Sequence, residues 1–219
     1  MKPVLYAHPF SSYCQKVLIA LYENDTPFTY RLLGPDDPEA LTELEALWPL
    51  KRFPVLVDDG RTVIETSVII EYLMNHHQGP SRLIPEKPDA ALEVRMMDRF
   101  FDNYVMTPMQ KVVLDHIRPD KDRDPYAVTE AKAMLETAYR WLDGVMAART
   151  WAAHDTFSLA DCAAAPALFY ADWVHEIGGE FGHVRAYRSR LLERPSFARA
   201  VEEAQPYRPL FPPGAPNRD

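Results

Sequence analysis

Residues 52–67 read RFPVLVDDGRTVIETS and contain two short apolar runs on either side of a turn. The runs at 54–57 and 62–64 are rich in valine, leucine and isoleucine, as buried strands are. The four residues between them, Asp58-Asp59-Gly60-Arg61, are a strong signal for a tight β-hairpin turn. The stretch therefore predicts two antiparallel strands, followed directly by a helix over residues 66–77.

Two features of this stretch bear on function. Pro54 opens the first strand, although proline has no N–H to donate to a neighbouring strand. One reason for a proline here would be a cis peptide bond before it. Such a bond would leave the backbone of Val55 free to pair with an extended peptide. Glu65, Thr66 and Ser67 stand at the helix start, where hydroxyls cap free amides. The carboxylate of Glu65 could also bind the ammonium group of a ligand. The hydroxyls and the free amides at the helix start could bind a carboxylate of that ligand. An ordinary strand-opening proline and ordinary helix capping are the alternatives.

The pattern of strands and helices divides the chain near residue 80. Upstream of the hairpin we expect a strand over 3–7, a helix over 11–24, a strand over 28–33 and a helix over 38–48. These elements complete an α/β domain over residues 1–78, with the order β-α-β-α-β-β-α. Residues 79–88 contain three prolines and indicate a linker. Residues 89–219 predict an all-helical domain, with helices over 90–117, 126–148, 158–174, 184–192 and 196–204.

The composition limits the classes of function. The 219 residues include 20 prolines but only 8 glycines, and no glycine-rich nucleotide-binding motif occurs. The net charge of -8 and the lack of a basic run argue against a nucleic-acid partner. No apolar run approaches the ~18 residues of a membrane span. Cys14 and Cys162 are expected to be reduced thiols in a cytoplasmic protein. No metal is expected.

A second polar cluster, HPFSSYC over residues 8–14, occupies the turn between the first strand and the first helix. A helix start offers free amides and the positive end of the helix dipole, which stabilise an anion, a thiolate included. Ser11 and Cys14 have the spacing of a CxxC redox pair whose first cysteine is replaced by serine. On local spacing alone, capping by Ser11 or Ser12 is the commoner role.

Four segments, in this order and covering nearly the whole chain, resemble a cytosolic glutathione S-transferase: SSYCQKVLIAL (11–21), LWPLKRFPVLVDDG (47–60), VIETSVIIEYL (63–73) and FSLADCAAAPAL (157–168). The resemblance implies a thioredoxin-like N-terminal domain followed by an all-α C-terminal domain. It also implies glutathione as co-substrate and a homodimer. The serine motif is similar to that of zeta- and theta-like members, and the subclass stays open.

The resemblance implies that seven residues bind glutathione, namely Arg52, Phe53, Pro54, Val55, Glu65, Thr66 and Ser67. The backbone of Val55 would pair with the cysteinyl unit. Glu65 would take the γ-glutamyl ammonium, Thr66 the adjacent carboxylate and Arg52 the glycyl carboxylate. Lys51 and Trp48 depart from the family pattern, so Arg52, Lys51 or another group could make the last contact.

The thiol of glutathione must lose its proton to react, and an ordinary cysteine-type thiol has a pKa of about 8.5. A hydroxyl that donates to sulfur lowers this value, and the resemblance makes Ser11 the first candidate, with Ser12 next. Tyr6, at the end of the first strand, and Cys14, one helical turn after Ser11, are alternative catalytic residues. Each has a simpler role as a core side chain. His8 is a further alternative, as a general base.

The second substrate implied by the resemblance is a hydrophobic small-molecule electrophile bound between the domains. Phe10, Tyr104 and Met109 are its expected contacts, the last two from the long helix over 90–117. Asp98 or Asp102 on this helix could reach across a dimer, although an ordinary solvated or ion-paired role is simpler.

The expected function is transfer of glutathione to such an electrophile. The alternatives are glutathione-dependent thiol–disulfide exchange or deglutathionylation, a zeta-like isomerisation, and a non-catalytic glutathione-binding regulatory role.

Overall fold

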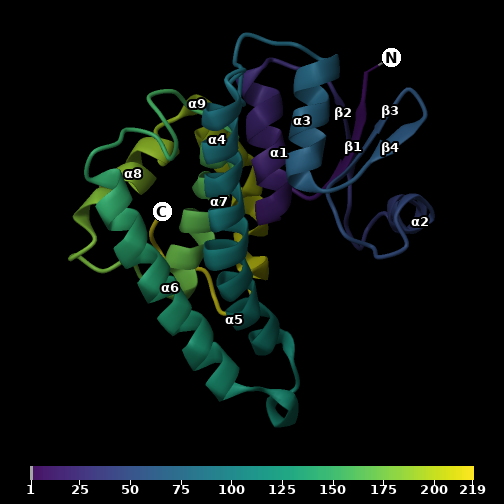
Figure 1. Ribbon diagram of the computed structural model, residues 1–219. Helices are drawn as coiled ribbons and strands as arrows, with labels where there is room; N and C mark the ends of the chain where they lie inside the picture. The colour runs from purple at the N-terminus through teal and green to yellow at the C-terminus, as the bar shows by residue number, and fades with distance from the viewer. Residues whose placement is uncertain (1) are drawn as a thin grey trace.

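A four-stranded sheet with helices on both faces forms the N-terminal part of the computed structural model, which describes residues 2–219 (Figure 1). Its elements are β1 (Val4–Ala7), α1 (Ser12–Glu23), β2 (Thr29–Leu32), α2 (Pro38–Leu47), β3 (Val55–Asp58), β4 (Arg61–Val63) and α3 (Thr66–His76). The predicted order β-α-β-α-β-β-α and the thioredoxin-like architecture are confirmed.

The strand order in the sheet is β2-β1-β3-β4. β1 pairs in parallel with β2 and antiparallel with β3, and β3 pairs antiparallel with β4. The turn between β3 and β4 holds Asp59 at φ 47° and Gly60 at φ 78°. Two successive left-handed residues are the backbone of the tight hairpin turn that the sequence predicts.

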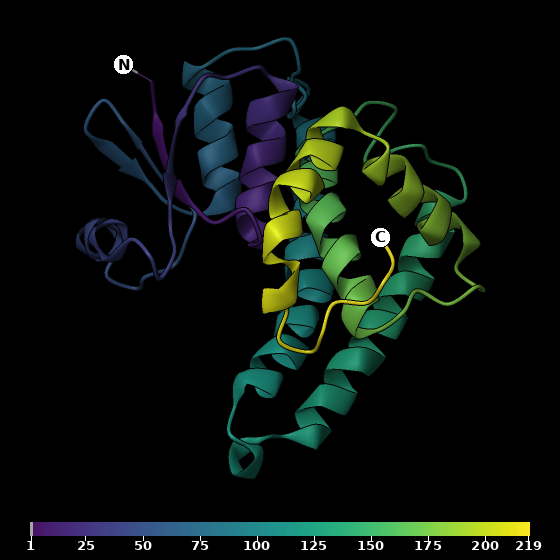
Figure 2. The ribbon, with the colours of Figure 1, turned by 180° about the vertical axis from the view of Figure 1, so that it is seen from behind.

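Apolar side chains on the two faces of the sheet pack against different helices. On one face, Leu5 and Leu56 are fully buried in the main core together with α1 and α3. On the other face, a smaller cluster joins Leu33 and Val55 to Ala40 and Leu44 of α2. The main core continues into the helical domain, so α1 and α3 lie between the sheet and the C-terminal helices (Figures 1 and 2).

The C-terminal part is entirely helical. Its elements are α4 (Pro88–Phe100), a π-helical segment (Phe101–Met106), α5 (Thr107–Ile117), a 3₁₀ turn (Asp120–Asp122), α6 (Pro125–Met146), α7 (Leu159–Val174), α8 (Gly182–Leu192), α9 (Pro195–Ala204) and a second 3₁₀ segment (Gln205–Leu210). The five predicted helices are present, with bounds shifted by one or two residues. The two 3₁₀ segments were not predicted.

The predicted helix over 90–117 is continuous but changes its winding in the middle. Phe100 and Thr107, which flank the π-helical segment, both keep right-handed helical dihedrals. A π-helical segment adds a residue to the turn and rotates the side chains after it relative to those before. Asp102 and Asn103 of this segment line the cleft described below.

Helix α7 is the centre of the molecule and packs against α1, α4, α5 and α8. The predicted capping box at its start is confirmed. The fully buried Asp161 carboxylate accepts from Ser158 N, Ser158 Oγ and Ala152 N, each at 2.9 Å, and from Tyr187 Oη at 2.6 Å. A carboxylate with four donors fixes the helix start and the chain before it.

Candidate functional site

A polar cleft of about 500 Å³ lies where the sheet domain meets the long helix. The segment before β3 contributes Lys51, Arg52, Phe53 and Pro54, and the start of α3 contributes Glu65 and Thr66. The opposite wall comes from helical residues, among them Arg99, Asp102, Asn103, Gln110 and Leu114. The cleft is therefore lined by both cations and carboxylates, which suits a zwitterionic peptide with two carboxylates.

A second, apolar cleft of about 230 Å³ adjoins the polar one. Its lining consists of Phe10, Ser11, Ser12, Phe53, Met109, Gln110, Val113, Leu114, Tyr170, Leu210, Phe211 and Pro212. None of these side chains is charged, so the space suits an uncharged apolar molecule. The expected contacts Phe10 and Met109 lie here.

Ser11, Phe53, Gln110 and Leu114 line both clefts. Ser11 is the N-cap of α1 and its Oγ accepts from Cys14 N at 3.4 Å. A hydroxyl oxygen that accepts there can still donate its own proton. Ser11 thus stands at the junction of a polar and an apolar cleft, at the positive end of a helix. Ser12 is the first residue of α1 and lines the apolar cleft only.

The backbone around the polar cleft takes two unusual conformations. The Phe53–Pro54 peptide bond is cis, which decides between the two alternatives that the sequence leaves open for Pro54. Glu65 has φ 69°, in the left-handed region that residues other than glycine seldom adopt. A left-handed backbone at a residue other than glycine is strained, and such residues concentrate at functional sites. Val55, the first residue of β3, is fully buried and packs with Ala40 and Leu44 of α2.

The two alternative thiolate-stabilising residues lie outside both clefts. The Tyr6 hydroxyl donates to Glu43 Oε2 at 2.9 Å on the α2 side of the sheet. Cys14 is fully buried, and burial raises the pKa of its thiol to about 12. The simpler role as a buried side chain therefore fits Cys14.

His8 is half-buried between the first strand and the C-terminal part. Its ring meets the ring of Tyr207 edge-on at 4.5 Å, and its Nδ1 accepts from Phe10 N at 3.1 Å. Burial lowers the pKa of His8, which favours the neutral ring that this acceptor role requires.

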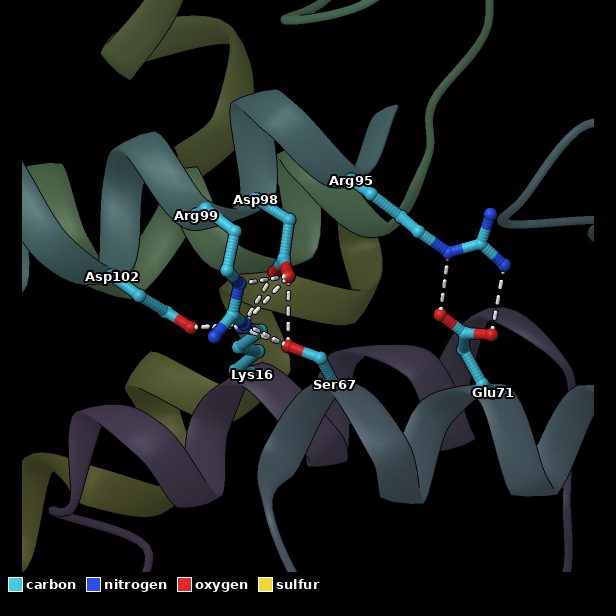
Figure 3. Close-up of polar contacts among 7 residues, drawn as sticks. All are labelled: Lys16, Ser67, Glu71, Arg95, Asp98, Arg99 and Asp102. Carbon is cyan, nitrogen blue, oxygen red and sulfur yellow. Dashed lines mark hydrogen bonds and ion pairs between the residues drawn. The ribbon is translucent and has the colours of Figure 1, made fainter. Parts of the chain in front are cut away.

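An interdomain charge cluster borders the polar cleft and consists of Lys16, Ser67, Asp98, Arg99 and Asp102 (Figure 3). Lys16 of α1 is only 1% exposed, and its Nζ lies 2.6 Å from Asp98 Oδ1 and 2.8 Å from Asp102 Oδ2. Arg99 Nη2 lies 2.7 Å from an oxygen of each carboxylate. Burial raises the pKa of Asp102, and attraction by Lys16 opposes that rise.

Ser67, a predicted glutathione residue, belongs to this cluster and does not line the cleft. Its Oγ donates to Asp98 Oδ2 at 2.8 Å and accepts from Lys16 Nζ at 3.0 Å. The ion-paired role of Asp98 and Asp102 is confirmed, whereas a solvated role is wrong, because both carboxylates are buried. About one turn earlier in α4, Arg95 binds Glu71 of α3 through two contacts of 2.8 and 2.9 Å (Figure 3).

Tyr104 is not part of either cleft. It is 52% exposed and packs beside Phe100. The residues that sequence reasoning missed include Tyr13, Asn103, Gln110 and Tyr170. The sequence around Asn103 and Gln110 does not mark them as site residues. They line the cleft only because the winding of the helix turns them toward it.

Within residues 2–219, no helix is long and apolar enough to cross a membrane. The same residues contain no group of three or more histidine, cysteine, aspartate or glutamate side chains placed to hold a metal ion. Both cysteines are free and buried.

Comparisons with known proteins match both domains of the chain to the same family. The model of the glutathione S-transferase N-terminal domain matches residues 5–81, and that of the C-terminal domain matches residues 104–195. A crystal structure of a glutathione S-transferase from Methylobacillus flagellatus with GSH bound has a TM-score of 0.82 and 25% identity, covering 91% of this chain and 98% of that one.

Two curated relatives show how varied similar proteins are. The chain is 25% identical over 224 residues to the probable maleylacetoacetate isomerase 2 of Drosophila melanogaster, covering 100% of this chain and 94% of that protein. It is 26% identical over 204 residues to the stringent starvation protein A homolog of Coxiella burnetii, covering 92% of each. With both domain models matched in order on the fold that they describe, the chain belongs to the glutathione S-transferase superfamily.

Proposed function

We propose that the protein binds glutathione in the polar cleft, stabilises its thiolate with Ser11, and adds it to an uncharged hydrophobic electrophile held in the apolar cleft. The observation that carries the proposal is the position of Ser11, which lines both clefts. A sulfur atom beside Ser11 would face the apolar space, where an electrophile would meet it.

The charges around the polar cleft support the binding mode. Glu65 lies at the start of α3 and would hold the γ-glutamyl ammonium, with the Thr66 amide and hydroxyl on the adjacent carboxylate. Arg52 and Lys51 line the same cleft and would hold the glycyl carboxylate. Lys51 also pairs with Glu45 at 2.8 Å, so Arg52 is the better candidate for that contact.

Removal of the Ser11 hydroxyl tests the proposal. Ser11→Gly keeps helix capping within a few tenths of a kcal/mol, whereas alanine would also lose the cap. We expect Ser11→Gly to bind immobilised glutathione, yet to lose the ultraviolet absorbance of bound thiolate at neutral pH and about 100-fold in kcat. Ser12→Gly is the matched control.

The outcomes of this experiment separate the steps of the proposal. Bound glutathione that remains a thiol in the unaltered protein would refute activation of the thiolate. Turnover retained by Ser11→Gly but lost by Ser12→Gly would assign the activation to Ser12 instead.

Isomerisation of a maleyl diketo acid is a second candidate, favoured by the full-length similarity to a probable maleylacetoacetate isomerase. The uncharged apolar cleft argues against it, because a substrate with carboxylates needs cations. Lys16, in the segment similar to zeta-like members, is already paired with two carboxylates. A direct isomerase assay, with glutathione present and absent, distinguishes the two.

No observation favours the two remaining alternatives, thiol–disulfide exchange and a non-catalytic role. Thiol–disulfide exchange requires an accessible thiolate, and Cys14 is buried with a raised pKa. A non-catalytic glutathione-binding role predicts binding without turnover of any electrophile.

A further inference from the structure

Arg31 of β2 binds helix α2 at two points. Its Nε and Nη2 each donate to one carboxylate oxygen of Glu43, in the middle of α2, at 2.9 Å. Its Nη1 donates to Asp37 Oδ2 at 2.6 Å, and Asp37 is the N-cap of α2. Because a guanidinium is planar and its donors point in fixed directions, these contacts set the direction of α2 as well as its distance from the sheet.

Tyr6 on the neighbouring strand adds a further contact. Tyr6 and Arg31 are paired in register across β1 and β2, and the Tyr6 hydroxyl donates to Glu43 Oε2 at 2.9 Å. The hydrogen bonds from Arg31 and Tyr6 hold the pKa of Glu43 below its ordinary value, so this carboxylate is charged at neutral pH. The α2 clasp consists of these four residues, Tyr6, Arg31, Asp37 and Glu43.

Apolar packing of α2 against the sheet is slight. Of its 10 residues only Ala40 and Leu44 are buried, in the smaller core cluster with Leu33 and Val55. Within residues 2–219, no ion pair other than those of Arg31 joins α2 to the sheet. α2 lies on the face of the sheet away from α1, α3 and the C-terminal helices (Figure 1). The clasp therefore supplies a large share of the contacts that set the position of α2.

The position of α2 matters because one wall of the polar cleft begins directly after it. Residues 48–53 follow α2 and contribute four side chains to the polar cleft, those of Trp48, Lys51, Arg52 and Phe53. Lys51 Nζ also lies 2.8 Å from Glu45 Oε2, which ties this loop back to α2. A shift or tilt of α2 would therefore move the two cations of the loop relative to the rest of the cleft.

We propose that Arg31 is a positioning residue that, through α2, places loop 48–53 to bind the glycyl carboxylate of glutathione. This inference rests on the proposed binding of glutathione in the polar cleft. Arg31 itself lines neither cleft. The γ-glutamyl end would not depend on the clasp, because Glu65 and Thr66 stand at the start of α3, on the opposite face of the sheet.

The opposing explanation is that Arg31 attracts the anionic tripeptide by its charge alone. Arg31→Lys distinguishes the two, because lysine keeps the charge but has a single nitrogen and cannot reproduce the three-pronged contact with Glu43 and Asp37. A positioning role therefore predicts that lysine restores little of what methionine loses, whereas a role of charge alone predicts full restoration.

The experiment measures the dissociation constants of two ligands by isothermal titration calorimetry. The first is glutathione, and the second is glutathione amide, in which a carboxamide of the same size replaces the glycyl carboxylate. We expect the unaltered protein to prefer glutathione about tenfold, as one charged hydrogen bond typically allows. Arg31→Met should bind glutathione about tenfold more weakly and the amide within about twofold of the unaltered protein. Arg31→Lys should lose more than about threefold for glutathione.

Two properties of the measurement exclude a general loss of structure. Calorimetry reports the affinity of the folded molecules, so partial unfolding of a variant would lower the number of sites and leave the ratio of the two constants unchanged. In addition, kcat with benzyl chloride at saturating glutathione should stay within about twofold in Arg31→Met while KM for glutathione rises, because only binding energy at the glycyl end is lost.

Arg95→Met is the matched control. Arg95 makes the same two-pronged contact, with Glu71, at 2.8 and 2.9 Å, but it joins α3 to α4 and does not touch α2. Since α3 carries the γ-glutamyl end of the proposed site, any disturbance of α3 should change the affinities for the two ligands alike. The preference of Arg95→Met for glutathione over the amide should therefore equal that of the unaltered protein.

The outcomes separate this inference from the proposed function. If the unaltered protein does not bind glutathione, the proposed function is overturned and the role of Arg31 with it. If it binds glutathione but Arg31→Met keeps the preference over the amide, or Arg31→Lys loses less than about threefold, or Arg95→Met loses the preference as well, the role of Arg31 alone is overturned.

Discussion

Replacement of Lys16 by methionine should strongly destabilise the fold. Methionine has a similar length and is apolar, so the packing volume is nearly kept while the charge is removed. The change leaves Asp98 and Asp102 buried without the cation that touches both of them. Arg99 still contacts both carboxylates, but its side chain is 50% exposed and cannot replace a buried ammonium.

The magnitude follows from the burial of the partners. Removing one member of a buried ion pair typically costs about 3–5 kcal/mol, because the remaining charge is desolvated and unpaired. Since Arg99 offsets a part of this, we expect a loss of about 3 kcal/mol in the free energy of unfolding, measured by urea denaturation. In a chain of this size that corresponds to a decrease in Tm of roughly 6–12 °C.

Lys51→Met is the matched control. Lys51 Nζ lies 2.8 Å from Glu45 Oε2, the same distance as Lys16 from Asp102, but the side chains of Lys51 and Glu45 are 61% and 57% exposed. An exposed pair contributes about 0–1 kcal/mol. A loss below about 1 kcal/mol for Lys16→Met, or equal losses in the two variants, would refute burial as the reason for the effect.

Three further outcomes are expected. Asp161→Ala removes the acceptor of four hydrogen bonds at the start of α7, so it should lower the free energy of unfolding by about 3 kcal/mol or more; a change below 1 kcal/mol in urea denaturation would contradict this. Cys14, whose pKa is raised to about 12 by burial, should remain unalkylated by iodoacetamide at pH 8 in the folded protein and react fully in urea; rapid labelling without urea, detected by mass spectrometry, would count against its burial. His8 has a lowered pKa in the folded state, so the unfolded state binds the proton more tightly and stability should fall as pH decreases below about 6.5. His8→Asn keeps an acceptor for Phe10 N and should show less of this loss between pH 7.5 and 5.5, whereas identical pH profiles of the two proteins would exclude His8 as the cause.

The features that were predicted from the sequence depend on local chemistry. The hairpin between β3 and β4 follows from Asp59 and Gly60, which can adopt left-handed backbone, and the start of α7 follows from Ser158 and Asp161. Each signal lies within four residues of the element that it specifies, so no knowledge of the fold is needed.

The features that were not predicted depend on contacts between distant segments. Lys16 meets Asp102, 86 positions away, and Gln15 meets Tyr170, 155 positions away. Nothing near Lys16 in the sequence distinguishes a buried lysine from a solvated one. Ser67 was assigned to glutathione from its motif, and only the packing of α3 against α4 reveals its bonds to Lys16 and Asp98.

The cleft residues could be predicted from the sequence only in part. Ser11, Arg52, Glu65 and Thr66 were selected from motifs, and the fold gathers all four around one cleft. Their assignment to glutathione and to the thiolate stays a prediction until a ligand is bound. The apolar wall was harder to predict, because Met109 resembles the buried methionines of the same helix, and only the winding of that helix turns it toward the cleft.

The wall that the two clefts share has a consequence for how selectivity can change. Phe53, Gln110 and Leu114 face both spaces, so a substitution that reshapes the space for one ligand also alters the surface offered to the other. Variants at these three positions should therefore trade affinity for one substrate against affinity for the other. Met109 and Phe211 line the apolar space alone, so under the proposed function substitutions there should change the range of electrophiles and leave the surface offered to the tripeptide as it is.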